Sequence, residues 1–412
     1  MVRLTVLGES GQSRRAVLLV YALIFYTAAL ELAIVPLLPP LSEEFDLSTF
    51  EAGALLASMN VTVMLASIPL GQLSDRIGAR RMTVAAAALY ALAAVGQGFS
   101  PTYELLLLSW ATFGLGVAIV VSGSLAWLSD VMPAEERATA LGGAATVSGI
   151  GVIAGPLFGG VLVESIGRGP SFLLATIFAG LLAVAVYAST GEPTRQPRRL
   201  PLSATLLAVR GEPLVLGGLA LVGLLGLVFG IVGVLIPLGL AANGLSSGEV
   251  GLVFSATAGV FIAVSWAIAR SGTRLVTLRL AAILAFAQSA ILLIPIASLS
   301  TIALVAFLFC RAPIWGISST ISYPLTADGA HRAGLGRGAI FGLLNLVWGM
   351  AAVAGPLLGG AIAQVVGERW AYGSLALFCA ASGGVLLTLA RQEASIRSVR
   401  SLTGEFAQEV AE

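Results

Sequence analysis

The sequence contains no lysine, and all 22 of its basic residues are arginine. A Walker A loop uses a lysine to reach the β- and γ-phosphates of a nucleotide. A Schiff base with retinal or pyridoxal phosphate uses a lysine amine. These absences exclude an ATP-driven pump that carries its own motor, a retinal pump and a pyridoxal enzyme. The sequence therefore indicates no cofactor.

Charge, histidine and cysteine are scarce as well. Only 10% of the 412 residues are charged, against about 25% in soluble domains, and the formal net charge is +1. A chain this close to neutral lacks the basic signature of nucleic-acid binding. One histidine and two cysteines, with no cluster of acids, predict neither a metal site nor a disulfide framework.

Apolar residues dominate instead, at 58% of the chain. A soluble fold cannot hide so many apolar groups behind so few charges, whereas a membrane helix needs about 20 of them in a row. We therefore expect an all-α membrane protein with twelve transmembrane helices. The expected spans are 16–38, 52–73, 82–99, 104–128, 138–163, 171–189, 214–239, 250–269, 275–297, 301–325, 338–364 and 371–390.

One long polar connection, 190–213, divides these spans into two sets of six. It contains Pro193, Pro197 and Pro201 and several arginines. The predicted organisation is an N-terminal six-helix bundle over 1–189, a cytoplasmic linker over 190–213, a C-terminal six-helix bundle over 214–390 and a cytoplasmic tail over 391–412. Nineteen arginines lie on the side of the N-terminus and two on the opposite side, so the positive-inside rule places both termini in the cytoplasm of a plasma-membrane protein.

The two sets of spans carry the same motifs. Gly155, Pro156 and Leu157 recur 200 residues later as Gly355, Pro356 and Leu357, and the segment from Leu47 to Gly53 recurs in part 198 residues later. Because an offset of six helices is even, the two halves have the same orientation. Two parallel six-helix bundles around a midplane site form a transporter architecture.

The segment from Gly71 to Arg81, Gly-Gln-Leu-Ser-Asp-Arg-Ile-Gly-Ala-Arg-Arg, resembles the signature loop of the major facilitator superfamily. The segment from Gly151 to Gly160 is similar to the antiporter motif of that family, and the first span is similar to its 12-span drug:proton antiporter branch. The resemblance implies alternating access around a central cavity and a conformational latch in which Asp75 meets the start of span eleven. The candidate latch residues are Gly71, Asp75, Arg76, Gly78, Arg80, Arg81, Asp130 and Arg137.

Glycines in spans five and eleven indicate close helix packing. Gly151, Gly155 and Gly159 recur every four residues and form one flat stripe, beside which Pro156 bends the helix. Gly355, Pro356 and Gly359 repeat the pattern. We expect both spans to lie at the interface between the halves.

Two ionisable residues lie deep inside spans. Glu31 is near the middle of span one, and Arg311 is about ten residues into span ten. Each costs about 2.5–3.5 kcal/mol at a span centre on insertion scales, so each is a functional hypothesis. We predict that Glu31 carries a coupling proton, and the alternative is a static Glu31–Arg311 ion pair. The candidate substrate and proton site comprises Glu31, Arg311, Tyr26, Trp110, Trp315, Tyr323 and Asn345.

These features favour a monomeric secondary transporter, not an enzyme, that exports small lipophilic or cationic compounds in exchange for protons. The resemblance has one departure: proton antiporters of the family usually carry an arginine in span four, where this chain has Trp110, and Arg311 is a candidate substitute. Uniport and another coupling ion therefore remain alternatives. So does uptake or facilitated transport of a metabolite such as a sugar or an organic anion, with Arg311 binding the anion.

The topology is testable with single cysteines in a variant that lacks Cys310 and Cys379. Because the number of spans is even, Thr5→Cys and Glu405→Cys should react with a membrane-impermeant maleimide only after cells are permeabilised. Asp46→Cys, in the first loop on the opposite side, should react in intact cells. Labelling of only one terminus in intact cells would contradict the topology.

Overall fold

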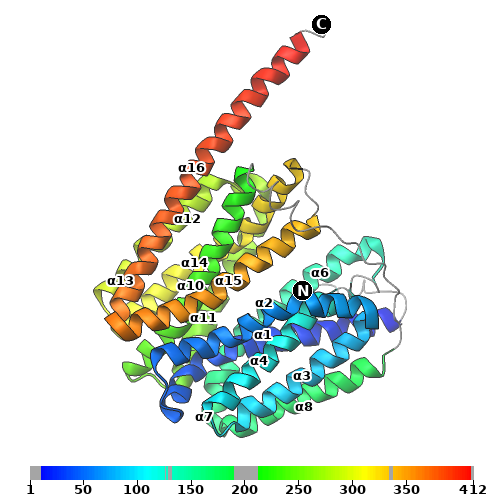
Figure 1. Cartoon of the computed structure of the whole chain (residues 1–412), viewed down its shortest axis with the longest axis vertical. Coiled ribbons are helices and arrows are strands. Elements are labelled where there is room, and N and C mark those ends of the chain that lie inside the picture. Colours follow the sequence, from blue (N-terminus) through cyan, green and yellow to red (C-terminus); the bar gives the residue numbers. More distant parts are fainter. Residues whose placement is uncertain (1–10, 126, 129–131, 190–211, 334–336, 410–412) are drawn as a thin grey trace. The chain divides into compact units, whose positions relative to one another are not determined.

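The computed structural model describes residues 11–125, 127–128, 132–189, 212–333 and 337–409, and within these ranges the regular structure is entirely helical (Figure 1). Most of the predicted linker and the predicted latch residue Asp130 lie outside the described residues. The first set of helices is α1 (Gly11–Glu44), α2 (Thr49–Ile77), α3 (Ala79–Phe99), α4 (Tyr103–Ile119), η2 (Val120–Ser124), α6 (Ala134–Leu157), η3 (Phe158–Leu162), α7 (Val163–Ile166) and α8 (Arg168–Tyr187). The second set is α10 (Pro213–Ala242), α11 (Ser247–Arg270), η4 (Gly272–Leu275), α12 (Leu278–Ile291), α13 (Leu293–Ala297), α14 (Thr301–Arg332), α15 (Arg337–Val366) and α16 (Glu368–Glu409).

Among the described residues, eleven helices are long and apolar enough to cross a membrane. The remaining predicted span, 104–128, corresponds to the shorter α4, which continues into the π-helix η2. The prediction of an all-α membrane protein is therefore confirmed. The tail after residue 390 is not a separate element, because α16 continues through it as one helix to Glu409.

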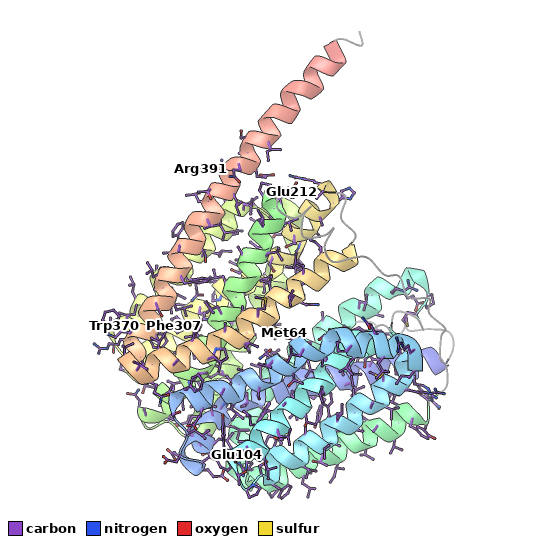
Figure 2. The ribbon with its side chains drawn as sticks, in the orientation of Figure 1. Met64, Glu104, Glu212, Phe307, Trp370 and Arg391 are labelled. Carbon is purple, nitrogen blue, oxygen red and sulfur yellow. The ribbon has the colours of Figure 1, made fainter. Side chains whose placement is uncertain are left out.

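The outer surfaces of the helices are apolar, as a lipid environment requires. Side chains project outward along the ribbons in Figure 2, and the labelled Trp370 is 69% exposed. Ile302 is 83% exposed and Val365 is 81% exposed. In water such a surface would promote association, whereas in a bilayer it is the surface that faces the acyl chains.

The chain forms two compact units, each described here by itself. The first contains residues 1–198, 230–259 and 352–365, and the second contains 199–229, 260–351 and 366–412. In the first unit α1 packs on α6, α3 on α8 and α2 on α4, and in the second α12 packs on α14 and α16. The division into bundles at 190–213 stays a prediction.

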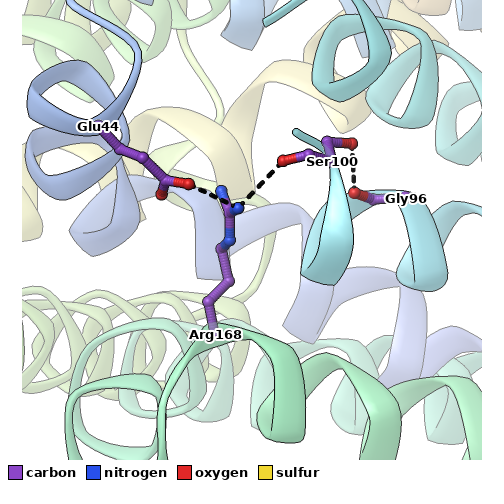
Figure 3. A network of polar contacts seen from close by, with 4 residues as sticks. All are labelled: Glu44, Gly96, Ser100 and Arg168. Atoms are coloured by element: carbon purple, nitrogen blue, oxygen red, sulfur yellow. Dashed lines mark hydrogen bonds and ion pairs between the residues drawn. The ribbon is translucent and has the colours of Figure 1, made fainter. Parts of the chain in front are cut away.

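Figure 3 shows a polar network in the first unit that joins the ends of three helices. Arg168, at the start of α8, donates to a Glu44 carboxylate oxygen at the end of α1 (2.8 Å) and to the Ser100 carbonyl oxygen after α3 (3.2 Å). The Ser100 hydroxyl donates in turn to the carbonyl of Gly96. Arg168 is one of the two arginines predicted on the side opposite the N-terminus, and here it ties helix ends together.

The predicted glycine stripe lies against α1. A Cβ atom added at each of these glycines would overlap a backbone carbonyl oxygen of α1, so the two helices approach to backbone contact. The pairs are Gly151 with Phe25, Gly155 with Ala29 and Gly159 with Ala33. The π-helix η3 begins two residues after Pro156, whereas α15 stays α-helical after Pro356.

A matched pair of substitutions tests this packing. Gly155→Ala should lower the midpoint of thermal unfolding in detergent, because the added methyl overlaps the Ala29 carbonyl, with an overpacking cost of about 1–3 kcal/mol. Gly180→Ala, in α8, meets nothing within 4 Å and should leave the midpoint unchanged or raise it, since alanine favours a helix over glycine. Equal effects of the two substitutions would show that α1 and α6 tolerate a wider spacing.

Candidate functional site

Glu31 lies on the stretch of α1 that packs against the glycine stripe of α6 and η3. It falls between Ala29 and Ala33, whose carbonyls face Gly155 and Gly159, and it is partly buried. Within its own unit, no hydrogen bond or ion pair of the described residues involves the Glu31 carboxylate. The helix that carries this acid is therefore held by backbone packing, and the acid itself is left without a fixed partner.

The neighbouring face of α1 contacts α3 and α8 through hydrogen bonds and aromatic rings. Tyr26 is only 4% exposed, stacks on Phe178 with ring centroids 5.9 Å apart, and donates from its hydroxyl to the Ala175 carbonyl (3.3 Å). Thr27 and Tyr90 share a 2.6 Å hydrogen bond between their hydroxyls. In this conformation Tyr26 serves helix packing.

Trp110 is similarly packed. It is 2% exposed, and its ring meets that of Phe113 edge to face, with centroids 5.8 Å apart. Its indole Nε1 has no hydrogen-bond partner among the described residues. The side chain that occupies the family's arginine position is thus a core residue of its unit.

Arg311 belongs to the second unit, and there it lies over an aromatic ring. Its guanidinium carbon is 4.0 Å from the ring centroid of Trp315, one helical turn further along α14. Trp315 adjoins Phe229 of α10 (5.9 Å) and Trp348 of α15 (6.3 Å). Within their unit, the structure therefore gathers three aromatic side chains into one cluster, and the predicted tenth-span cation lies over one of them, Trp315.

The remaining predicted site residues of this unit are more open. Tyr323, in α14, is 40% exposed. Asn345, in α15, is exposed. Glu31 lies in the other unit, so the alternative of a Glu31–Arg311 ion pair remains a hypothesis.

The signature loop contacts the end of α8. Arg80 donates to the carbonyl oxygens of Tyr187 (3.0 Å) and Ser189, which lie at and just beyond the α8 C-terminus. A cation is favoured there, because the last carbonyls of a helix carry partial negative charge. Gly78 adopts φ 97°, a conformation that suits glycine and permits the sharp turn from α2 to α3.

The other predicted latch residues differ in their exposure. Arg76, Arg81 and Arg137 are exposed, and Gly71 is half-buried. The side chains of Asp75 and Arg337 are not among those described, so the latch between Asp75 and the start of α15 stays a prediction.

The internal repeat recurs as two matching helix crossings within the first unit. In one crossing α6 and η3 meet the start of α11, and in the other α15 meets the start of α2. A Cβ atom added at any of the glycines involved would strike backbone of the opposite helix. The matching contacts are Gly160 with Ser247 and Gly360 with Thr49, and Gly251 with Pro156 and Gly53 with Pro356.

A hydrogen bond to the first turn of a helix accompanies each crossing. The Gly248 N–H of α11 donates to the Glu164 carboxylate of α7, and the Phe50 N–H of α2 donates to the Gln364 side-chain oxygen of α15 (3.2 Å). The first N–H groups of a helix have no partner within the helix, so they can donate to side-chain oxygens such as these. One crossing therefore has a charged acceptor, and its copy has a neutral one.

Sequence reasoning missed Glu164 and Gln364, although they are also 200 residues apart. It also missed that the repeated segment from Leu47 to Gly53 contains a capping box, with Ser48 and Glu51 exchanging side-chain and backbone bonds (2.8 and 3.2 Å). Ser246 and Glu249 repeat it at α11 (2.9 and 3.3 Å). The signal was Ser-x-x-Glu before an apolar run.

These features define a multi-pass helical transporter. The family model for the Major Facilitator Superfamily matches residues 17–341, and the chain belongs to this superfamily. Two crystal structures share the fold over most of both chains. They are of a bacterial homologue of the human lysosomal transporter Spinster, in an inward-facing unoccupied state (TM-score 0.71, 17% identity, 93% of this chain and 96% of that one) and an inward-facing occupied state (TM-score 0.73, 16% identity, 91% and 96%).

Curated relatives match shorter stretches. Multidrug resistance protein 1 of Bacillus subtilis is 30% identical over 164 residues, which are 40% of this chain and 42% of that protein. Methyl viologen resistance protein SmvA of Salmonella typhimurium is 35% identical over 108 residues, 26% of this chain and 22% of that protein. The matches span half or less of the length of these relatives. The superfamily to which the chain belongs is a superfamily of transporters.

The two acceptors at the helix crossings give a prediction. Glu164→Ala removes the acceptor of the Gly248 N–H and should lower the stability in detergent by about 0.5–2 kcal/mol, the usual effect of losing a helix cap. Glu164→Gln should retain most of the stability, because Gln364 is an amide in the matching position. The midpoint of thermal unfolding is the measurement.

Glu43→Ala is the control, since Glu43 is an exposed acid on α1 and takes part in none of the described contacts of the two crossings. A Glu164→Ala variant as stable as this control would show that the crossing does not depend on the cap.

Proposed function

We propose that the chain exports small lipophilic aromatic or cationic compounds in exchange for protons, by alternating access, as a monomer in the plasma membrane with both termini in the cytoplasm. Relatives named for resistance to multiple drugs and to methyl viologen support export of this kind. The observation that carries proton coupling is Glu31, a carboxylate inside a membrane helix with no fixed partner among the described residues of its unit.

A coupling carboxylate must exchange its proton when the site changes its exposure. An acid in a fixed ion pair resists protonation, because its partner favours the charged form. Glu31 has no such partner among the described residues of its unit, and its helix is anchored by backbone contacts at Ala29 and Ala33. A change in water access around Glu31 then changes its protonation without unpacking α1.

The matching helix crossings fit the same proposal. The contacts of Gly160 and Gly360 with the opposite helices are backbone contacts, each accompanied by a hydrogen bond from the first turn of a helix. Such a hydrogen bond contributes about 0.5–1.5 kcal/mol net with a neutral acceptor and about 1.5–3 kcal/mol with a charged one, so the helices separate at modest cost. Both crossings lie on the side opposite the N-terminus, and we propose that they close that side in the described conformation.

Uptake or facilitated transport of a sugar or organic anion is the second candidate, and the unpaired atoms of Arg311 favour the anion. The direction of gradient-driven transport separates the two functions. Proteoliposomes with an imposed pH gradient and methyl viologen as cargo provide the assay. Export requires cargo to move against the proton flux.

Glu31→Gln should reduce pH-gradient-driven methyl viologen transport to the level of protein-free liposomes, because the amide keeps the size of the side chain and cannot bind and release a proton. Exchange of labelled for unlabelled methyl viologen without a gradient should persist, since cargo binding and rocking remain.

Glu43→Gln, on the same helix and exposed, is the matched control and should transport like wild type. Unchanged gradient-driven transport in Glu31→Gln would remove Glu31 from the coupling mechanism.

A further inference from the structure

The guanidinium of Arg311 has an unused hydrogen-bonding edge. Its Nε and Nη2 atoms are inaccessible to water and have no hydrogen-bond partner among the described residues. These two nitrogens lie on the same side of the guanidinium and donate in parallel. A carboxylate fits such an edge with both of its oxygens.

The unit that contains Arg311 supplies no counter-charge to it. Arg332, on the same helix, is paired with Glu393 (3.1 Å), whereas no described acid of the unit pairs with Arg311. The titratable group that interacts with Arg311 electrostatically is the thiol of Cys379, which is fully buried. An unpaired cation shielded from water is costly, so this arrangement favours the arrival of an anion.

A second unpaired donor belongs to Gln288, which lines a small cavity together with the same aromatic residue. A small cavity between α10, α12 and α14 is lined by Trp315, Gln288, Ser318 and apolar side chains such as Leu224 and Val228. Gln288 is 5% exposed, and its Nε2 has no partner among the described residues. The unsatisfied side-chain atoms of Arg311 and Gln288 are all donors.

We propose that the region around Arg311 on α10, α14 and α15 binds an aromatic carboxylate, and this inference rests on the proposed transport function. The carboxylate lies on the Nε and Nη2 edge of Arg311, and the ring packs against the cluster of Phe229, Trp315 and Trp348. The preferred cargo is then an aromatic acid or zwitterion, in addition to neutral lipophilic compounds. Stacking on Trp315 holds the guanidinium plane in place before cargo arrives.

The test is equilibrium binding to the purified full-length protein, followed by tryptophan fluorescence, with 2-naphthoate and its neutral isostere 2-naphthamide. Wild type should bind the carboxylate at least about tenfold more tightly, as expected for a charge-assisted bond in a site shielded from water. Arg311→Gln should abolish this preference and retain the affinity for the amide, which also shows that the variant is folded.

Two further variants test whether the preference for the carboxylate depends on the paired nitrogens of Arg311. Arg311→Lys retains the charge and loses the paired edge, so it should show a weaker preference than wild type. Arg332→Gln is the matched control on α14 and should keep the wild-type preference, because that arginine is already paired with Glu393.

Several outcomes would overturn the inference. Wild type could bind the amide as tightly as the carboxylate, or Arg311→Gln could keep the full preference. Sodium nitrate could bind as tightly as 2-naphthoate, which would make this an inorganic anion site without an aromatic component. A preference that is absent in wild type and gained in Glu31→Gln would assign the counter-charge of Arg311 to Glu31.

This assay needs neither a membrane nor a gradient, so its result is separate from that of the transport assay. Loss of proton-driven export with an intact naphthoate preference would refute the proposed function alone. Proton-driven methyl viologen export without any naphthoate preference would refute the inference alone.

Discussion

The structure depends on backbone contact between helices at positions where no side chain fits. Gly155 and Gly159 bring α6 and η3 against the carbonyls of α1, while Gly160 and Gly360 bring the same motif and its copy against the starts of α11 and α2. In a membrane the hydrophobic effect does not drive helices together, so close van der Waals packing must do so. Glycine makes that contact close, and because it contributes no interlocking side chain, the contact can also be broken and remade.

The duplicated crossings show how one motif serves two purposes. One face of the glycine-rich helix fixes α1, which carries Glu31, and another meets a helix from the opposite half of the sequence. The hydrogen bonds at these crossings differ only in their acceptor, Glu164 in one and Gln364 in the other. The repeat is thus symmetric in packing and asymmetric in charge. This asymmetry gives one crossing a sensitivity to its electrostatic surroundings that its copy lacks.

Glu31 and Arg311, the two charged residues predicted deep inside membrane helices, have different surroundings. Glu31 is carried by a helix pinned through its backbone, and it has no fixed partner in its unit. Arg311 is stacked on Trp315 and keeps a carboxylate-shaped edge unfilled. An acid that can exchange its proton and a base that can receive an anion are separate chemical functions.

The sequence by itself determined the class of fold, the number and order of the spans, the repeat and the residues with buried charge. It did so because membrane insertion depends on local composition, and because Gly-Pro motifs and an Arg-rich loop carry their constraints in a few adjacent positions. The tertiary structure decided which face of each helix is used. Tyr26 and Trp110 were expected in the binding site, and both are packed among other aromatics, because a helical residue can face a core or a cavity with the same spacing. Likewise, only the folded chain brings Glu164 to Gly248 and Arg80 to the end of α8. The residues of these contacts are about 80 to 110 positions apart in the sequence. No local sequence pattern indicates which helix end such a side chain will contact.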